Sequence, residues 1–289
     1  MKHTKHGCPV PAGILVIIGG KENKGQAQAP ERESPSGFVT MDVLRIFTGL
    51  SKKKDNRILV ITSGSADGAA SFREYKKVFT ELGHADTVHV HHETRQEVLQ
   101  DAELLDKINA ADSVFLAGGD QLLLTSLYGG TAFLTRFKER YIAERLIVGG
   151  TSAGAMALST PMIYAGNEEV QQVSGEIKVT TGLEFLKDVC IDTHFVHRGR
   201  FVRLAQVITT NPGCMGLGIE EDTALIVRHG NEVEIAGSGT VIRIAGFSIT
   251  GADMKNFTDK KAFSVRNLTV DILAAGDRFT IEQLNPPHY

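Results

Sequence analysis

The sequence predicts an α/β fold: a mostly parallel, flavodoxin-like sheet with helices on both faces and an antiparallel C-terminal extension. Short apolar runs rich in Val, Ile and Leu recur in the first half of the chain, and stretches with helical periodicity separate them. Strands that are covered on both faces have this continuous apolar pattern. Beyond residue 160 the pattern changes to strands joined by tight turns, which predicts the antiparallel part.

Five apolar runs supply the predicted parallel strands, and a helical pattern follows each one. The strands are expected at 14–20, 57–66, 86–92, 113–121 and 145–154. The helices are expected near 41–50, at 71–83, near 97–109, and after residues 121 and 154. In the helix at 71–83, Phe72, Tyr75 and Phe79 lie on one face, and Gly83 is a favourable C-terminal cap.

The antiparallel strands are expected at 216–228, 232–246 and 267–279, with tight turns at 229–231 and 237–239. The chain contains neither a Gly/Ser-rich linker nor an internal repeat, so a single α/β domain over residues 1–289 is expected. The segment 21–37 is polar and contains prolines, which predicts an exposed loop.

Composition excludes several classes of function. With 289 residues, 42% of them hydrophobic, the chain can bury a large core. A net charge of −3 gives no overall positive field, so neither nucleic acid nor an anionic membrane is an expected partner. The three cysteines are scattered without a Cys-x-x-Cys pair, which is typical of a reducing compartment. The first apolar run is too short to span a bilayer, so a cytoplasmic protein is expected.

The segment GGTSAGAMA, residues 149–157, places Ser152 in a turn among very small residues. Residues 150–154 match G-x-S-x-G between a strand and a helix, where a sharp turn exposes the serine hydroxyl. The amide of Ala153 begins the helix, and unpaired amides there favour developing negative charge. The hypothesis is a nucleophilic serine. A glycine-rich turn that binds a phosphate or only packs has the same pattern, so that interpretation stays open.

Nucleotide and metal sites are not supported by the other motifs. Residues 20–25 have the spacing of a phosphate-binding loop, but Gln26 and Ala27 stand where Lys and Ser/Thr are required. His89, His91 and His92 resemble metal ligands, yet 92 points away from the other two and no Cys or carboxylate pattern completes a site. We therefore expect no cofactor and no metal.

A serine nucleophile needs a base and an acid that orients the base. His194 follows a short apolar strand, 189–191, and His197 is its competitor as the base. A helix carrying three arginines is expected next, and these are Arg198, Arg200 and Arg203. Arginine pairs with carboxylates in a two-pronged geometry, which suits a carboxylate-bearing substrate. A solvated helix face would explain the same three charges.

Three acids interrupt the apolar strand predicted at 216–228: Glu220, Glu221 and Asp222. Charged groups within a strand are costly unless they are paired or exposed. Strand alternation places Glu221 on one face and its two neighbours on the other. The orienting acid is expected among these three residues.

Four motifs, in this order, resemble the cyanophycinases, of a serine peptidase family that also contains aspartyl dipeptidases. The motifs are GGDQ (118–121), GGTSAGA (149–155), DTHFVHRGRFVRL (192–204) and GLGIEEDTA (216–224). Together they are specific, whereas GTSAG alone would not be. The resemblance implies a triad in which Ser152 is the nucleophile, His194 the base and Glu221 the orienting acid.

The resemblance also implies the substrate and the residues that bind it. An oxyanion hole is implied near Gly119 and Ala153. The implied substrate pocket uses Gln121, Asp192, Arg198, Arg200 and Arg203. The implied substrate is cyanophycin, a poly-aspartate chain with an arginine on each β-carboxyl, from which β-Asp-Arg dipeptides are released. A homodimer is implied as well.

The chemistry of this polymer agrees with the implied pocket. Each of its side groups carries a carboxylate, which arginines bind, and a guanidinium, which needs a carboxylate such as Asp192. A charge left unpaired in a closed pocket would cost several kcal/mol, so such a pocket would reject ordinary peptides.

Three alternatives remain open from the sequence. An α/β-hydrolase-type esterase or peptidase has its triad in the order Ser, acid, His, and His229 would then be the base. An aspartyl dipeptidase of the same family would bind a single carboxylate, which leaves three arginines in excess. A flavodoxin-like sensor or binding module would hold an anionic ligand in the glycine-rich turns.

Overall fold

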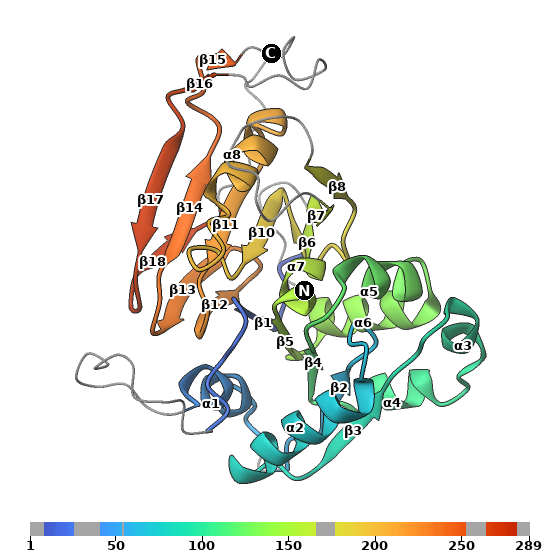
Figure 1. Ribbon diagram of the computed structural model, residues 1–289. Helices are drawn as coiled ribbons and strands as arrows, with labels where there is room; N and C mark the ends of the chain where they lie inside the picture. The colour runs from blue at the N-terminus through green and yellow to red at the C-terminus, as the bar shows by residue number, and fades with distance from the viewer. Residues whose placement is uncertain (1–8, 26–40, 54, 166–176, 253–263, 282–289) are drawn as a thin grey trace.

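The computed structural model describes residues 9–25, 41–53, 55–165, 177–252 and 264–281 (Figure 1). Its helices are α1 (Asp42–Gly49), α2 (Gly68–Glu81), α3 (Arg95–Gln100), α4 (Leu104–Ala110), α5 (Gln121–Tyr128), α6 (Ala132–Ala143), α7 (Ala153–Ala157) and α8 (Phe201–Thr210). Its strands up to residue 193 are β1 (Ile14–Ile18), β2 (Ile58–Ile61), β3 (Thr87–Val90), β4 (Ser113–Leu116), β5 (Ile147–Thr151), β6 (Ser159–Thr160), β7 (Met162–Ala165), β8 (Lys178–Thr180), β9 (Leu186–Lys187) and β10 (Val189–Thr193). The later strands are β11 (Met215–Ile219), β12 (Thr223–Arg228), β13 (Glu232–Gly237), β14 (Val241–Ala245), β15 (Gly251–Ala252), β16 (Val265–Arg266), β17 (Thr269–Leu273) and β18 (Arg278–Thr280).

The larger sheet confirms the predicted α/β fold class. Its strand order is β18-β13-β12-β1-β5-β4-β2-β3. The five strands from β1 to β3 in this order run parallel, and β12, β13 and β18 extend the sheet in antiparallel fashion. A second sheet has the order β17-β14-β11-β10-β6-β9. Two short pairs, β7-β8 and β15-β16, complete the strand pairing of the described residues.

The C-terminal strands divide between the two sheets, which differs from the predicted boundaries. The run 216–228 is not one strand: β11 ends at Ile219 in the smaller sheet, and β12 begins at Thr223 in the larger one. The two later runs divide in the same way, because 232–246 supplies β13 and β14, and 267–279 supplies β17 and β18. The three acids predicted inside a strand therefore lie in the turn between sheets, where Asp222 has a left-handed φ of 50°.

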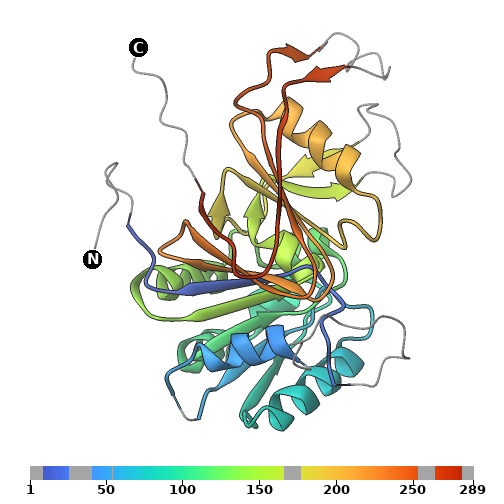
Figure 2. The ribbon, with the colours of Figure 1, turned by 90° about the vertical axis from the view of Figure 1, so that its left-hand side faces the viewer.

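Two apolar layers cover the larger sheet. On one face, α1 and α2 pack through an aromatic cluster in which Phe47 and Phe79 contact Phe115 of β4. Figure 2 shows these two helices, blue and teal, together on one side of the sheet. On the other face, α3 to α6 pack on residues such as Leu15, and the same cluster continues to Leu217 of the smaller sheet. The two sheets therefore share a hydrophobic core.

Local sequence signals set the ends of several helices. The helix predicted at 71–83 is α2, in which the Asp67 carboxylate caps the Ala70 amide and Gly83 has a φ of 90°. The helix predicted near 97–109 is two helices, α3 and α4. A capping box between Thr94 and Glu97 begins the first of them. Among the described residues, no helix is long and apolar enough to cross a membrane.

The topology brings distant segments to one edge of the larger sheet. At the carboxyl end of β1, Ile18 pairs with Thr151 of β5 on one side and with Ala224 of β12 on the other. The residues after β1 and β5 and those before β12 therefore meet. β10 and β11 of the smaller sheet also end together, because Thr193 pairs with Ile219.

The predicted exposed loop 21–37 falls largely outside the described residues, which include only 21–25 of it. Within that part the prediction is wrong at Glu22, which is buried. Its carboxylate accepts hydrogen bonds from the Tyr75 hydroxyl and the Thr151 hydroxyl, both at 2.6 Å. Two partners distant in sequence explain how a charged residue in a polar segment becomes buried.

Candidate active site

Ser152 lies in a sharp turn between β5 and α7, with a φ of 51° and a ψ of −117°. Its neighbours leave no space for side chains: a Cβ on Gly150 would meet the Gly154 carbonyl at 2.7 Å, and one on Gly154 would collide with the Leu116 carbonyl. The Ser152 amide donates to the Ile18 carbonyl at 3.1 Å. The predicted strand–turn–helix context of G-x-S-x-G is therefore present, and its glycines are required sterically.

His194 lies beside the serine. Its Nε2 is 3.0 Å from Ser152 Oγ, and the ring is buried. The residue follows the end of β10 with a φ of 50°, and its amide donates to the Gly19 carbonyl at 2.9 Å. A Cβ on Gly20 would collide with Cε1 and Nε2 of the ring. The turn after β1 therefore fixes both the backbone and the ring of His194, a role that the sequence alone did not indicate.

Glu221 lies on the other side of the imidazole. His194 Nδ1 and Glu221 Oε1 are 2.7 Å apart, and Lys21 Nζ lies 3.2 Å from the same oxygen. The structure therefore brings Ser152, His194 and Glu221 into one hydrogen-bonded series. The strand alternation used to separate Glu221 from its neighbours does not apply, because these residues form a turn.

The other two acids have different partners. Glu220 Oε2 accepts from the amides of Val196 and His197 at 2.5 and 3.1 Å, which holds the turn that follows His194. Asp222 accepts from the Asn23 amide at 2.9 Å and the Ser238 hydroxyl at 3.1 Å. Each acid in this turn therefore stabilises a separate contact.

The environment of the imidazole lowers its basicity. Burial is the largest cause of a lowered pKa for His194, and Arg198 and Arg200 act in the same direction. The hydrogen bond that His194 Nδ1–H donates to the Glu221 carboxylate opposes them without cancelling the shift. Burial also disfavours ionisation of Glu221, but the contacts with His194 and Lys21 outweigh it and lower its pKa. The arrangement is a neutral imidazole between a hydroxyl and a carboxylate, which can activate the hydroxyl as a nucleophile.

The two competing histidines have other surroundings. His197 is exposed, and its backbone amide binds Glu220. His229 is exposed and directly follows Arg228, the last residue of β12. Its Nδ1 lies 3.1 Å from Glu232. In β12, Val227 pairs with Leu15 near the start of β1, whereas Ser152 lies beyond the end of β1. His229 is therefore at the opposite edge of the sheet.

A polar pocket of about 220 Å³ opens beside Ser152. Seven of the sequence-predicted residues line it: Gly119, Gln121, Ser152, Ala153, Arg198, Arg200 and Arg203. The sequence did not indicate the others, which are Met156, Ile163, Tyr164, Ala165 and Thr193. The Gln121 side-chain amide donates to the Ile163 carbonyl at 2.9 Å, which connects α5 to β7 beside the pocket.

Asp192 lies behind the arginines, not in the pocket. It is fully buried, Arg203 Nε donates to its Oδ2 at 2.6 Å, and Arg200 donates to its Oδ1 at 3.2 Å. The expectation that Asp192 meets a substrate guanidinium directly is therefore corrected: its carboxylate orients two of the chain's own arginines. Only one of the three arginines predicted on a helix lies within it: α8 begins at Phe201 and contains Arg203, whereas Arg200 is its N-cap residue and Arg198 lies in the preceding turn.

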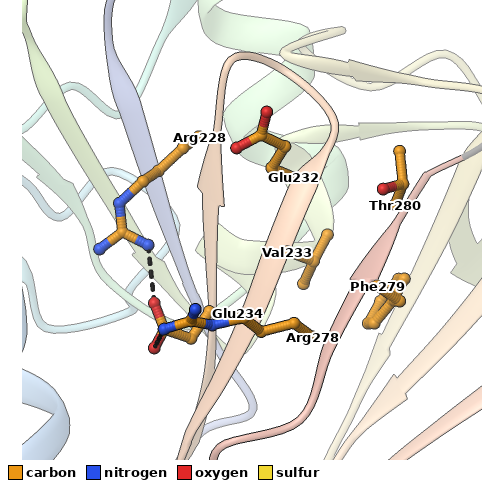
Figure 3. Close-up of a pocket in the computed structure, with 7 residues that line it drawn as sticks. All are labelled: Arg228, Glu232, Val233, Glu234, Arg278, Phe279 and Thr280. Carbon is orange, nitrogen blue, oxygen red and sulfur yellow. Dashed lines mark hydrogen bonds and ion pairs between the residues drawn. The ribbon is translucent and has the colours of Figure 1, made fainter.

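Two other polar sites have different chemistry. A pocket of about 550 Å³ lies along β12, β13 and β18 (Figure 3), where Glu234 pairs with both Arg228 and Arg278 at 2.9 Å. The seven described residues that line it include no histidine or serine. His89 and His91 share the Thr62 hydroxyl at 2.8 and 3.1 Å, and no group of three or more metal-ligating side chains occurs among the described residues.

Comparison with known proteins identifies relatives over most of the chain. The model of peptidase family S51 matches residues 37–235. The chain is 28% identical over 269 residues to a cyanophycinase of Trichormus variabilis, covering 93% of this chain and 86% of that protein. It is 26% identical over 273 residues to a cyanophycinase of Geminocystis herdmanii, covering 94% and 95%.

Solved structures share the fold. A peptidase from an acI-B1 Actinobacterium superposes with a TM-score of 0.63 at 18% identity, covering 94% of this chain and 98% of that one. A putative peptidase E protein from Listeria monocytogenes EGD-e gives a TM-score of 0.51 at 18% identity, covering 78% and 98%. At this level of identity the likeness concerns the fold alone.

Proposed function

This chain belongs to peptidase family S51, and from that premise we propose that it is a serine exopeptidase that hydrolyses cyanophycin to β-Asp-Arg dipeptides. The observation that carries the proposal is the series from Ser152 Oγ to His194 Nε2 at 3.0 Å and from His194 Nδ1 to Glu221 at 2.7 Å. Cyanophycinases that match more than nine-tenths of this chain support the choice of substrate.

In the proposed mechanism, Ser152 Oγ attacks the carbonyl carbon of the scissile bond while His194 Nε2 accepts the hydroxyl proton. Glu221 accepts a hydrogen bond from Nδ1–H, which keeps Nε2 free as the base and stabilises the imidazolium that forms. The tetrahedral intermediate collapses, and His194 gives its proton to the leaving amine. Water then repeats the sequence on the acyl-enzyme. The amides of Gly119 and Ala153 are the proposed donors to the oxyanion.

The proposed substrate preference follows from the wall of the pocket. Arg198, Arg200 and Arg203 line it beside the serine, and they suit the carboxylates that the polymer carries on every side group. Asp192 supports this function indirectly by orienting Arg200 and Arg203. An aspartyl dipeptidase needs recognition of a single carboxylate, so this wall favours the polymer. The order of the residues, with Glu221 after His194, also disfavours the α/β-hydrolase alternative.

The test compares the wild type with Ser152→Ala on purified cyanophycin, with dipeptide release followed by mass spectrometry. We expect kcat to fall by about 10⁴-fold or more, because the nucleophile is lost. Ser126→Ala, an exposed serine on α5, is the matched control and should leave the rate unchanged. Residual activity within tenfold of the wild type would overturn the assignment of Ser152 as the nucleophile. Cleavage of Asp-Leu without cleavage of the polymer would overturn the substrate.

A further inference from the structure

The turn that follows β1 contacts each of the three segments that carry the proposed triad. The Gly19 carbonyl accepts the His194 amide, and the Gly20 carbonyl accepts the Asp222 amide, both at 2.9 Å. Glu22 binds the hydroxyl of Thr151, the residue before Ser152. Residues 19–23 thus connect the nucleophile turn, the histidine and the acidic turn. The proposed mechanism assigns no role to the side chains of this segment.

Lys21 occupies the centre of this turn in an unusual conformation. Its φ is 41°, a left-handed value that is strained for a lysine, and Gly20 before it has a φ of 101°. The side chain of this lysine reaches the acidic turn. Lys21 Nζ lies 3.2 Å from Glu221 Oε1, which is the same oxygen that meets His194 Nδ1.

Anchors on both sides fix the backbone of Lys21. On the C-terminal side, Glu22 is buried between the hydroxyls of Tyr75 and Thr151, and the Asn23 amide donates to Asp222 at 2.9 Å. On the N-terminal side, the Gly19 amide donates to the Thr223 carbonyl at 2.9 Å. The point from which the lysine side chain extends is therefore set by the fold, although the side chain itself is 57% exposed.

We propose that Lys21 is a positioning residue for this reaction: its ammonium holds the Glu221 carboxylate in place against Nδ1 of His194. The proposal rests on the proposed function of the triad and adds to it a fourth residue. Lys21 is not among the described residues that line the pocket beside Ser152. It acts through Glu221, which has both the imidazole and the ammonium on one oxygen.

The charges around His194 and Glu221 determine how the replacement of Lys21 changes the pKa of His194. His194 faces Glu221, Arg198 and Arg200, and Glu221 faces His194 and Lys21. Loss of the ammonium leaves the Glu221 carboxylate less firmly held, which lowers kcat/KM. It also removes a positive charge that competes with the imidazolium for the same carboxylate oxygen, which raises the pKa of His194. Because the reaction needs a neutral imidazole, the acid limb of the activity profile moves to higher pH.

An ordinary surface ion pair would have none of these consequences. Exposed pairs contribute little to stability and are screened by salt. If Lys21 formed only an ordinary surface ion pair, its replacement would change neither kcat/KM nor the pH dependence of the activity. The pH profile therefore distinguishes a positioning role from a structural one.

The experiment compares Lys21→Met, Lys21→Arg and the control Lys53→Met in the full chain. Lys53 is 71% exposed and pairs with Asp112 at 2.6 Å, so its loss changes the net charge equally at the opposite edge of the sheet. We expect Lys21→Met to lower kcat/KM about threefold to tenfold and to move the acid limb up by about half a pH unit to one unit. Lys21→Arg should restore the acid limb, and Lys53→Met should match the wild type.

A second measurement does not depend on turnover. The ring of His194 is titrated by NMR, with its signal assigned by its loss in His194→Gln, and Lys21→Met should raise the midpoint by a similar amount. An unchanged midpoint in both measurements overturns the role of Lys21 while leaving the triad intact. If Ser152→Ala retains full activity, the proposed function fails instead, and the NMR midpoint still decides whether Lys21 acts on His194.

Discussion

The Cα of Gly20 lies against the edge of the His194 imidazole, so that a Cβ at this position would overlap the ring atoms Cε1 and Nε2. Nε2 is also the atom that meets Ser152 Oγ. A single methyl group at Gly20 would therefore occupy the space in which the proposed base operates. The required absence of a side chain makes Gly20 part of the active-site architecture.

Gly20→Ala should reduce kcat on cyanophycin by about 100-fold, because displacement of a reacting group by about 1 Å has an effect of that size. Gly83→Ala is the matched control. Gly83 also has a positive φ, 90°, but nothing lies within 4 Å of the place that its Cβ would take. Both variants should lose about 1–2 kcal/mol of unfolding free energy from backbone strain. Equal kcat values for the two variants would contradict the steric explanation.

The pKa shift of His194 predicts the pH dependence of kcat/KM. Burial lowers the pKa of the imidazole below its ordinary value of 6.5. Below its pKa the protonated ring cannot accept the serine proton, so activity is lost as the pH falls through the value in the folded protein. The midpoint of the acid limb should therefore lie below 6.5, measured as dipeptide release in buffers of constant ionic strength. A midpoint above 6.5 would show that Glu221 dominates over burial.

The parallel part of the fold was predictable because strands covered on both faces are continuously apolar. The run 14–20 contains β1, which is fully buried. Of the aromatic positions in the predicted helix at 71–83, Tyr75 and Phe79 contact Phe115 of β4, and Phe72 stacks on His89 of β3. The position of Ser152 was predictable for a similar reason, since only very small residues fit around its turn. These features depend on local sequence and on burial, which leave a periodic signal.

Features that depend on distant partners were not predictable. The turn at Glu220–Asp222 lies between two apolar runs, which together look like one strand although they enter different sheets. Glu22 lies in a polar segment, and its burial depends on Thr151, 129 residues away. Asp192 was expected in the pocket from the family resemblance. Its partner Arg203 is only 11 residues away, but the sequence does not show which side of the arginines the carboxylate occupies.

The three adjacent acids should differ sharply when each is replaced by its amide. Glu221→Gln should lower kcat by about 10³–10⁴-fold, because a neutral amide cannot stabilise the imidazolium and can select the wrong tautomer. Glu220→Gln should cost at most about tenfold, since the amide oxygen still accepts from the Val196 and His197 amides. Asp222→Asn should behave like Glu220→Gln. Steady-state kinetics on cyanophycin ranks the three variants, and a larger loss for Glu220→Gln than for Glu221→Gln would reassign the orienting acid.

The buried pairing of Asp192 gives a prediction about stability that is separate from catalysis. Asp192 is fully buried and bridges Arg200 and Arg203, so Asp192→Asn leaves two buried guanidinium groups facing a neutral amide. The loss of one partner from a buried ion pair typically costs about 3–5 kcal/mol. Asp271→Asn removes a carboxylate that pairs with Arg243 at the edge of the smaller sheet, where both side chains are partly exposed, and should cost about 0–1 kcal/mol. Urea denaturation measures the free energy of unfolding of both variants against that of the wild type.

Because Arg200 and Arg203 also line the pocket, Asp192→Asn should raise KM for cyanophycin even where the protein remains folded, whereas Asp271→Asn should not. Equal losses of stability in the two variants would mean that the arginines are held by other contacts and that Asp192 does not orient them.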